Sequence, residues 1–168
     1  MIKVLKDNIV NMDVDAVVNA ANAELMGGGG VDGAIHYAAG NKLHDACLKI
    51  GHCDVGDAVI TPGFNLKAKY IIHTVGPIYY ENDKHTNEQL LSSCYKRSLD
   101  LAKLHGIESI AFPCISCGVY GYPIQAASAI AYNTVNKWLI DSGYQIDVYF
   151  VCFKDEEYKA FQAIIENE

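Results

Sequence analysis

The sequence predicts an α/β protein, with a central sheet and helices packed on both of its faces. Short apolar segments of strand length alternate along the chain with longer segments in which apolar residues recur at helical spacing. Glycine or proline marks most of the junctions between these segments. Chains that alternate in this way build open sheets, and ligands bind to them beyond the carboxyl ends of the strands.

The first half of the chain is expected to hold four strands and one long helix. The strands are expected over residues 2–10, with a possible break near Asp7 and Asn8, and over residues 16–18, 57–62 and 70–75. One helix is expected over residues 31–50, because apolar side chains recur there every three or four positions. Gly51 is expected to end this helix.

The second half is expected to hold two strands and three helices. The strands are expected over residues 109–113 and 146–153. Thr86-Asn87-Glu88-Gln89 has the form of a capping box, so the first helix is expected to begin there and to end near residue 105. Pro123 suits the first turn of a helix that ends at Gly143. Asp155 is expected to cap a final helix that ends near residue 166.

Length and composition indicate one globular domain, residues 1–168. Hydrophobic residues make up 51% and charged residues 20% of the chain, which is ordinary for a globular protein. Apolar runs stay well below the roughly 18 residues that a membrane span needs. The N-terminal segment lacks the long apolar core of a signal peptide, which predicts a cytoplasmic protein without membrane association.

The charge of the chain argues against a nucleic-acid partner. The formal net charge is -7, from 13 basic and 20 acidic residues, and the basic residues do not cluster. Nucleic-acid binding depends on basic surfaces that neutralise phosphates. A phosphate on this protein would have to be held by local backbone amides, which favours a small ligand with one or two phosphates.

Residues 27–30 are four consecutive glycines between an apolar strand and an alanine-rich helix, and the chain is organised around them. Glycines leave backbone N–H groups accessible, and a helix N-terminus favours anions, so this arrangement predicts phosphate binding. Asn19, Asn22 and Asp32 flank the glycines and add polar groups to the site. A flexible surface loop is the alternative, but the apolar segments on both sides argue against it. Neither of the usual nucleotide-binding fingerprints fits.

Residues 116–123 form a second glycine-containing turn between a predicted strand and a predicted helix. Two amide-rich loops at one sheet edge would hold a pyrophosphate from both sides. Cys117 also completes a Cys-x-x-Cys with Cys114, which is half of a zinc site or a redox pair. A second cysteine pair and the usual helix setting are missing, so neither a metal site nor redox use is expected. All six cysteines are expected to be free thiols, mostly buried in apolar segments, and no disulfide is expected in a cytoplasmic chain of this size.

Four segments of the chain resemble the macro domain family, and its MacroD-type branch in particular. They are residues 18–22, 27–36, 73–77 and 116–123, and they follow one another in the family's order and spacing over essentially the whole chain. The resemblance implies a three-layer α/β/α sandwich around a mixed, mostly six-stranded sheet, with a cleft for ADP-ribose. It also implies a metal-independent hydrolase without a cofactor. Such an enzyme releases ADP-ribose from esters of protein acidic side chains and deacetylates O-acetyl-ADP-ribose.

The resemblance also implies roles for individual residues. Asn22 and Asp32 would serve the distal ribose and the attacking water, with His36 nearby as a third catalytic candidate. Tyr120 would cover the distal ribose. The expected ligand-binding residues are Asn8, Ile9, Asn19, Gly29, Gly30, Val31, Ser116, Cys117, Gly118, Val119, Tyr120 and Phe153.

Each of these roles has a structural alternative. Asp32 could cap a helix, Asn22 could stabilise a turn, and His36 or Tyr120 could pack within the loops. The chain also departs from the family at Asn8, where many members have an aspartate that binds the adenine amino group, and an amide oxygen accepts that hydrogen bond more weakly. Asp7, next to it, could substitute.

Two further departures accompany this one. Tyr37 replaces an arginine that is usual in the branch, and Cys117 replaces a common threonine. The expected partners are ADP-ribose and ADP-ribosylated proteins, and a monomer is expected. A module that binds ADP-ribose without turnover is the alternative function.

Overall fold

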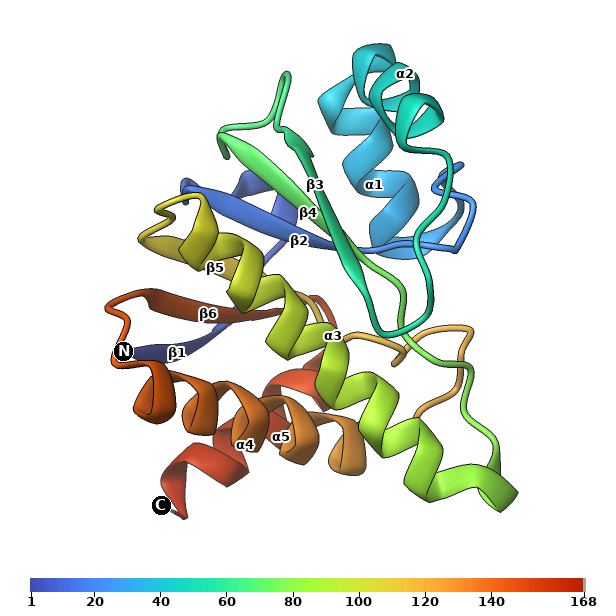
Figure 1. Ribbon diagram of the computed structural model, residues 1–168. Helices are drawn as coiled ribbons and strands as arrows, with labels where there is room; N and C mark the ends of the chain where they lie inside the picture. The colour runs from blue at the N-terminus through green and yellow to red at the C-terminus, as the bar shows by residue number, and fades with distance from the viewer. Residues whose placement is uncertain (168) are drawn as a thin grey trace.

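The computed structural model describes residues 1–167, and in this part of the chain six strands form one mixed sheet (Figure 1). The strand order is β1-β6-β5-β2-β4-β3. All neighbouring strands are parallel except β3, which pairs antiparallel with β4 at one edge. The strands are β1 Ile2–Lys6, β2 Ala16–Ala20, β3 Ala58–Pro62, β4 Tyr70–Thr74, β5 Ser109–Phe112 and β6 Asp147–Cys152.

Helices cover both faces of this sheet. Figure 1 shows α1 and α2 on one face and α3, α4 and α5 on the other. The helices are α1 Gly30–Ala39, α2 Asn41–Ile50, α3 Lys84–Leu104, α4 Ile124–Ser142 and α5 Asp155–Glu166, with short 3-10 helices η1 Ile9–Asn11 and η2 Glu81–Asp83. In the described residues no helix combines the length and apolar character needed to cross a membrane.

The central strands are apolar on both sides because each side faces a different core. In β2, Ala16 and Val18 belong to the core shared with α3, α4 and α5, whereas Val17 belongs to the core under α1 and α2. In β4, Ile72 and Ile71 divide in the same way. Strands of a covered parallel sheet are expected to be apolar on both faces. The expected three-layer α/β/α sandwich with a mixed six-stranded sheet is therefore confirmed.

The single helix expected over residues 31–50 is wrong, because the chain forms two helices, α1 and α2, that meet at Gly40. Gly40 has φ +91°, a conformation that side chains of other residues rarely adopt. A Cβ at this position would also lie 2.9 Å from Nδ2 of Asn65. The apolar spacing continued through Gly40 because both helices bury one face against the same core, through Ile35 and Leu43.

Several other expected boundaries differ from the structure, among them the end of the second strand, which continues from residue 18 to Ala20. The first strand ends at Lys6, because the Asn8 side chain accepts a hydrogen bond from Val10 N and caps η1. The helix expected from Thr86 begins earlier, at Lys84, and the predicted capping box lies inside it. The final helix is capped at Lys154, and Asp155 is its first residue.

Candidate active site

Most of the residues expected to form the site follow four adjacent strands. β1, β6, β5 and β2 are neighbours and run parallel, so their carboxyl ends lie in a row at one edge of the sheet. Asn8 follows β1, Phe153 follows β6, residues 113–123 follow β5, and the glycine loop follows β2. Figure 1 shows the loops after β2 and β5 leaving the sheet on the same side. The topology therefore brings together segments that are separated by up to 145 positions in the chain.

The glycine loop leads directly into the N-terminus of α1. Gly29 is the N-cap residue, and no side chain of the described residues caps this helix end. Gly30 has φ +57°. A Cβ at Gly33 would lie 2.3 Å from the carbonyl oxygen of Gly28, so the loop folds back onto the helix only because residue 33 is glycine. The uncapped helix end offers backbone N–H groups and partial positive charge to an anion.

The side chains of Asn22 and Asp32 converge on Gly28. A Cβ at Gly28 would lie 3.5 Å from Oδ2 of Asp32 and 3.9 Å from Nδ2 of Asn22. The Asn22 amide also holds the loop, since its Nδ2 donates to Gly27 O at 2.9 Å and its Oδ1 accepts from Met26 N at 3.1 Å. The structure thus places the two expected catalytic residues side by side, next to the phosphate-binding candidate.

Asp32 is buried, with 6% of the residue exposed, and its carboxylate is polarised from one side. Its Oδ1 accepts a hydrogen bond of 2.8 Å from Nδ2 of Asn19 and lies 3.4 Å from Nε2 of His36. Burial raises the pKa of Asp32, while the Asn19 hydrogen bond and the His36 ring act in the opposite direction. Because Oδ1 faces these two partners, Oδ2 is the oxygen directed toward the glycine loop.

Asn19 belongs to a buried chain of hydrogen bonds beneath Asp32. Its Nδ2 also lies 3.1 Å from Nδ1 of His73, whose Nε2 lies 3.0 Å from Oγ1 of Thr61. The Thr61 hydroxyl donates to Pro62 O. The only consistent assignment has Asn19 donating both of its amide protons, to Asp32 and to His73 Nδ1, while His73 Nε2 donates to Thr61.

Burial lowers the pKa of His73 to about 3, with the neighbouring His36 ring as the second cause. The histidine is therefore neutral, as this assignment requires. Asn19 is fully buried, so the structure places it under the site as a support for Asp32 and not in the cleft. His73 and Thr61 were not expected to serve the site, and their separation from Asp32 in the sequence gives no signal of it.

His36 is half-buried on α1 and faces a surface groove of about 350 Å³. The groove is lined by the glycine loop at Gly27 and Gly28 and by side chains that include His36, Tyr37 and His44. A Cβ at Gly27 would lie 3.5 Å from the His36 ring. His36 thus lies between the Asp32 carboxylate and the surface groove beside the glycine loop.

The second loop combines a fixed base with an open tip. Ser116 has φ +66° and is buried, and its hydroxyl donates to Pro77 O at 2.8 Å. A Cβ at Gly76 would lie 2.2 Å from Ser116 Oγ, so the two segments approach closely. At the tip, a Cβ at Gly118 would meet nothing within 4 Å, and Val119 is fully exposed. The tip is therefore accessible to a ligand.

The loops after β1 and β6 lie side by side, because Asp7 N donates to Cys152 O at 3.1 Å. Phe153 is 71% exposed and follows β6, so its ring is accessible to a ligand at this edge of the sheet. Ile9 is buried, and the Asn8 side chain is occupied in part by capping η1. The expectation of no disulfide is wrong, because Cys114 and Cys117, three positions apart in the tight turn after β5, are bonded to each other near Glu157.

Comparison with known proteins supports the family resemblance that the sequence motifs indicate. The macro domain family model matches residues 18–131. An O-acetyl-ADP-ribose deacetylase of Citrobacter rodentium is 47% identical over 99% of this chain and 96% of its own length. The human ADP-ribose glycohydrolase MACROD2 is 46% identical over 96% of this chain, which corresponds to 38% of the human protein.

Solved structures agree with the sequence relatives. A macrodomain of Oceanobacillus iheyensis with ADP superimposes with a TM-score of 0.91 at 41% identity, covering 98% of this chain and 89% of the other. The sequence motifs, the sheet topology and these matches lead to one conclusion: the chain belongs to the macro domain family.

Proposed function

We propose that this protein is a hydrolase that releases ADP-ribose from esters of acidic protein side chains and removes the acetyl group from O-acetyl-ADP-ribose. The observation that carries the proposal is the convergence of Asn22 and Asp32 on Gly28, at the uncapped N-terminus of α1. The names of the bacterial deacetylase and the human glycohydrolase support this activity, and the ADP-containing macrodomain supports the ligand class.

The two glycine-containing loops would hold the diphosphate of the ligand. The N-terminus of α1 supplies N–H groups on one side, and the open tip at Gly118 and Val119 lies along the same sheet edge. Backbone amides bind phosphate without added positive charge, which suits a chain with a net charge of -7. The exposed ring of Phe153 would stack on the adenine, and Asn8, beside it, would accept from the adenine amino group.

A diphosphate in this position brings the distal ribose to Asn22 and Asp32. The Asn22 amide would hydrogen-bond the ribose hydroxyls, and Oδ2 of Asp32 would accept a hydrogen bond from the attacking water. Because burial raises the pKa of Asp32, its carboxylate is a stronger base than that of an exposed aspartate. Asn19 holds the other oxygen and fixes the direction in which Oδ2 faces.

Hydrolysis then follows the ordinary course of ester cleavage. Water adds to the acyl carbon as Oδ2 of Asp32 accepts its proton. The bond between the acyl carbon and the ribose oxygen then breaks, and the ribose oxygen takes up that proton as it leaves. The products are a free carboxylic acid and ADP-ribose. Holding the water and the ester together supplies much of the acceleration, because orientation replaces a bimolecular encounter.

The test is release of ADP-ribose from a protein that carries it on glutamate, compared between wild type and Asp32→Ala. We expect the variant to be slower by at least about a hundredfold, since it loses a group that orients or deprotonates water. Asp45→Ala, which removes an exposed carboxylate on α2, is the matched control and should keep full activity. If wild type and Asp32→Ala bind ADP-ribose by calorimetry but release it equally slowly, the protein is a binding module.

The proposal extends to the setting of the enzyme. We infer that it acts as a monomer, on ADP-ribosylated proteins of the cytoplasm. Sedimentation at the concentration used for the activity assay tests the first inference. Fractionation of cells that express the tagged chain tests the second.

A further inference from the structure

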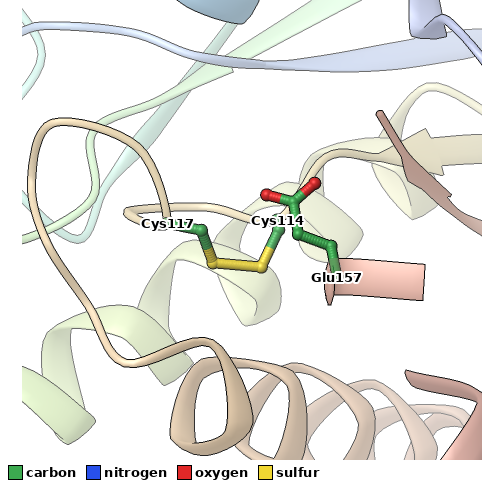
Figure 2. A group of neighbouring side chains, drawn as sticks. All are labelled: Cys114, Cys117 and Glu157. Carbon is green, nitrogen blue, oxygen red and sulfur yellow. A yellow bond between two sulfur atoms is a disulfide. The ribbon is translucent and has the colours of Figure 1, made fainter. Parts of the chain in front are cut away.

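The loop between β5 and α4 carries a disulfide that the proposed hydrolysis does not use. Cys114 and Cys117 are bonded to each other, and the Glu157 carboxylate from the first turn of α5 lies within 4.8 Å of both sulfur atoms. Figure 2 shows the three side chains grouped together, with the carboxylate close to Cys114. We propose that Cys114 and Cys117 form a reversible thiol–disulfide site, with Glu157 as its proton-transfer group, and that its oxidation state sets the affinity of the second loop for ADP-ribose.

Accessibility distinguishes Cys114 from the other cysteines. Cys114 is half-buried, whereas its partner Cys117 is buried, as are the four free cysteines: Cys47, Cys53, Cys94 and Cys152. Burial raises the pKa of each of these four thiols, to about 11 or 12, so they carry little thiolate at neutral pH. Thiol–disulfide exchange needs a thiolate and access to sulfur. Exchange is therefore directed to the bonded pair, and to Cys114 first.

Glu157 is placed to hold a proton next to the disulfide. It is buried, and burial raises the pKa of its carboxyl group. Lys154 lies at the start of the same helix and Glu156 beside it, while Cys152 on β6 and Tyr95 on α3 are close enough for the Glu157 charge to raise their pKa values. The Lys154 charge and its backbone N–H oppose the rise in pKa, and Glu156 adds to it.

The exchange can be written with a dithiol as the reductant. One thiolate of the dithiol attacks Sγ of Cys114, the S–S bond breaks, and the electron pair leaves on Cys117, which takes a proton from Glu157. The second thiol of the reductant loses its proton to solvent and attacks the mixed disulfide. This step releases Cys114, which is protonated by solvent, and the reductant departs as a cyclic disulfide. Solvent returns the proton to Glu157, and a disulfide oxidant reverses the sequence.

The disulfide is connected to the part of the loop that would hold phosphate, so this control rests on the proposed function. Cys117 lies between Ser116, which is fixed by its bond to Pro77 O, and the exposed Gly118. Cys117 N also donates to Cys114 O, which closes a tight turn beneath the tip of the loop. Reduction releases this constraint. The oxidised form, with its loop already ordered, should bind ADP-ribose more tightly.

The first experiment counts thiols. The protein is equilibrated with mixtures of reduced and oxidised dithiothreitol, quenched, denatured and alkylated, and its mass is measured. We expect a reversible change between four and six alkylated cysteines in wild type and in the control Cys53→Ala a change between three and five, while Cys114→Ser shows none. A pair that stays reduced in every mixture overturns the proposal.

The second experiment tests Glu157 through the pH dependence of reduction. Glu157→Gln keeps the oxygen that accepts from Lys154 N and so should preserve the helix start. We expect reduction by dithiothreitol, corrected for its own thiolate fraction, to slow about tenfold and to lose its dependence on pH. An unchanged pH profile would assign Glu157 a purely structural role.

The third experiment measures ADP-ribose binding by calorimetry on oxidised and reduced protein, with the double variant Cys114→Ser, Cys117→Ser as the permanently open form. We expect the oxidised protein to bind about tenfold more tightly than the other two. Equal affinities overturn the redox control but leave the proposed function intact, whereas absence of binding in every form overturns the proposed function. Reduced protein that retains one zinc ion after desalting, and then resists oxidation, would show a metal site in place of a redox pair.

Discussion

Asn19 Nδ2 lies 2.8 Å from Asp32 Oδ1, although the two residues come from different elements, β2 and α1. Asn19 is fully buried and has no access to a ligand. Its amide protons serve the carboxylate on one side and His73 on the other. Asn19 thus fixes the position of the Asp32 carboxylate and favours its ionised form, while the glycine loop lies next to the other carboxylate oxygen.

Removal of this support should change the pH dependence of activity. In Asn19→Leu, Asp32 loses the hydrogen bond that lowers its pKa, while the burial that raises it remains. The carboxylate is needed in its ionised form, so activity is lost as the pH falls through this pKa. We expect the acid limb of kcat/KM to move to higher pH. A pH–rate profile measures the shift, and superimposable limbs for wild type and variant would contradict it.

His73 should make the fold sensitive to acid. Its pKa is about 3 in the folded chain, compared with about 6.5 when unfolded, so only the unfolded chain binds the proton between these values. The stabilisation by neutral His73 is therefore complete above pH 6.5 and is lost as the pH falls toward 3. The loss amounts to about 1.4 kcal/mol per pH unit, or about 3 kcal/mol at pH 4.

The variant His73→Asn tests this dependence, because it removes the titration and keeps an acceptor for Asn19. Urea unfolding at pH 7 and pH 4 gives the change in the free energy of unfolding for each protein. We expect the variant to be less stable at pH 7 but to lose about 3 kcal/mol less on acidification. Equal losses in both proteins would mean that the buried ring does not resist protonation.

Glycines of the two loops should differ sharply in their tolerance of substitution. Gly33→Ala places a Cβ 2.3 Å from Gly28 O and should lower the free energy of unfolding by about 1–3 kcal/mol, with displacement of the loop and weaker ADP-ribose binding. At Gly29 and Gly118 a Cβ meets nothing within 4 Å. Valine at either position should therefore leave the fold intact but weaken ADP-ribose binding, because the side chain covers the amides.

Thermal unfolding and calorimetry on the three variants check this expectation. The informative comparison is Gly33→Ala against Gly29→Val. Full affinity in Gly29→Val would show that the amides at the start of α1 do not contact the ligand.

Phe153 should contribute to affinity and not to stability. Its ring is 71% exposed, so Phe153→Ala should leave the melting temperature unchanged and weaken ADP-ribose binding about 10- to 100-fold through loss of stacking. Leu104→Ala serves as the control, because it removes another exposed side chain far from the site. Leu104 ends α3, which leads to the amino end of β5, whereas Phe153 follows the carboxyl end of β6. Calorimetry with ADP-ribose and with ribose 5-phosphate separates the adenine contribution, which only the first ligand should lose.

The sequence alone determined the fold class and the position of the glycine loop. These features depend on local patterns: the apolar run at Val17 and Val18, the glycines of residues 27–30, and the helical spacing after them. The family resemblance, now confirmed, extended these patterns to a three-layer sandwich. The roles of Asn22 and Asp32 remain predictions, although the structure places the two side chains together.

The tertiary structure alone decided what lies beneath and beside the site. The sequence did not place Thr61 or His73 near Asp32, because β3 and β4 reach it only through sheet pairing across more than 25 positions. It did not show the break at Gly40, since the apolar spacing runs through it and only the backbone conformation reveals it. It predicted neither a disulfide nor metal or redox use for Cys114 and Cys117, whereas the structure bonds them to each other beside the buried Glu157. The hydrogen bonds of Thr61 and His73 and the approach of Glu157 to the disulfide join segments distant in the chain, and local patterns carry no record of such contacts.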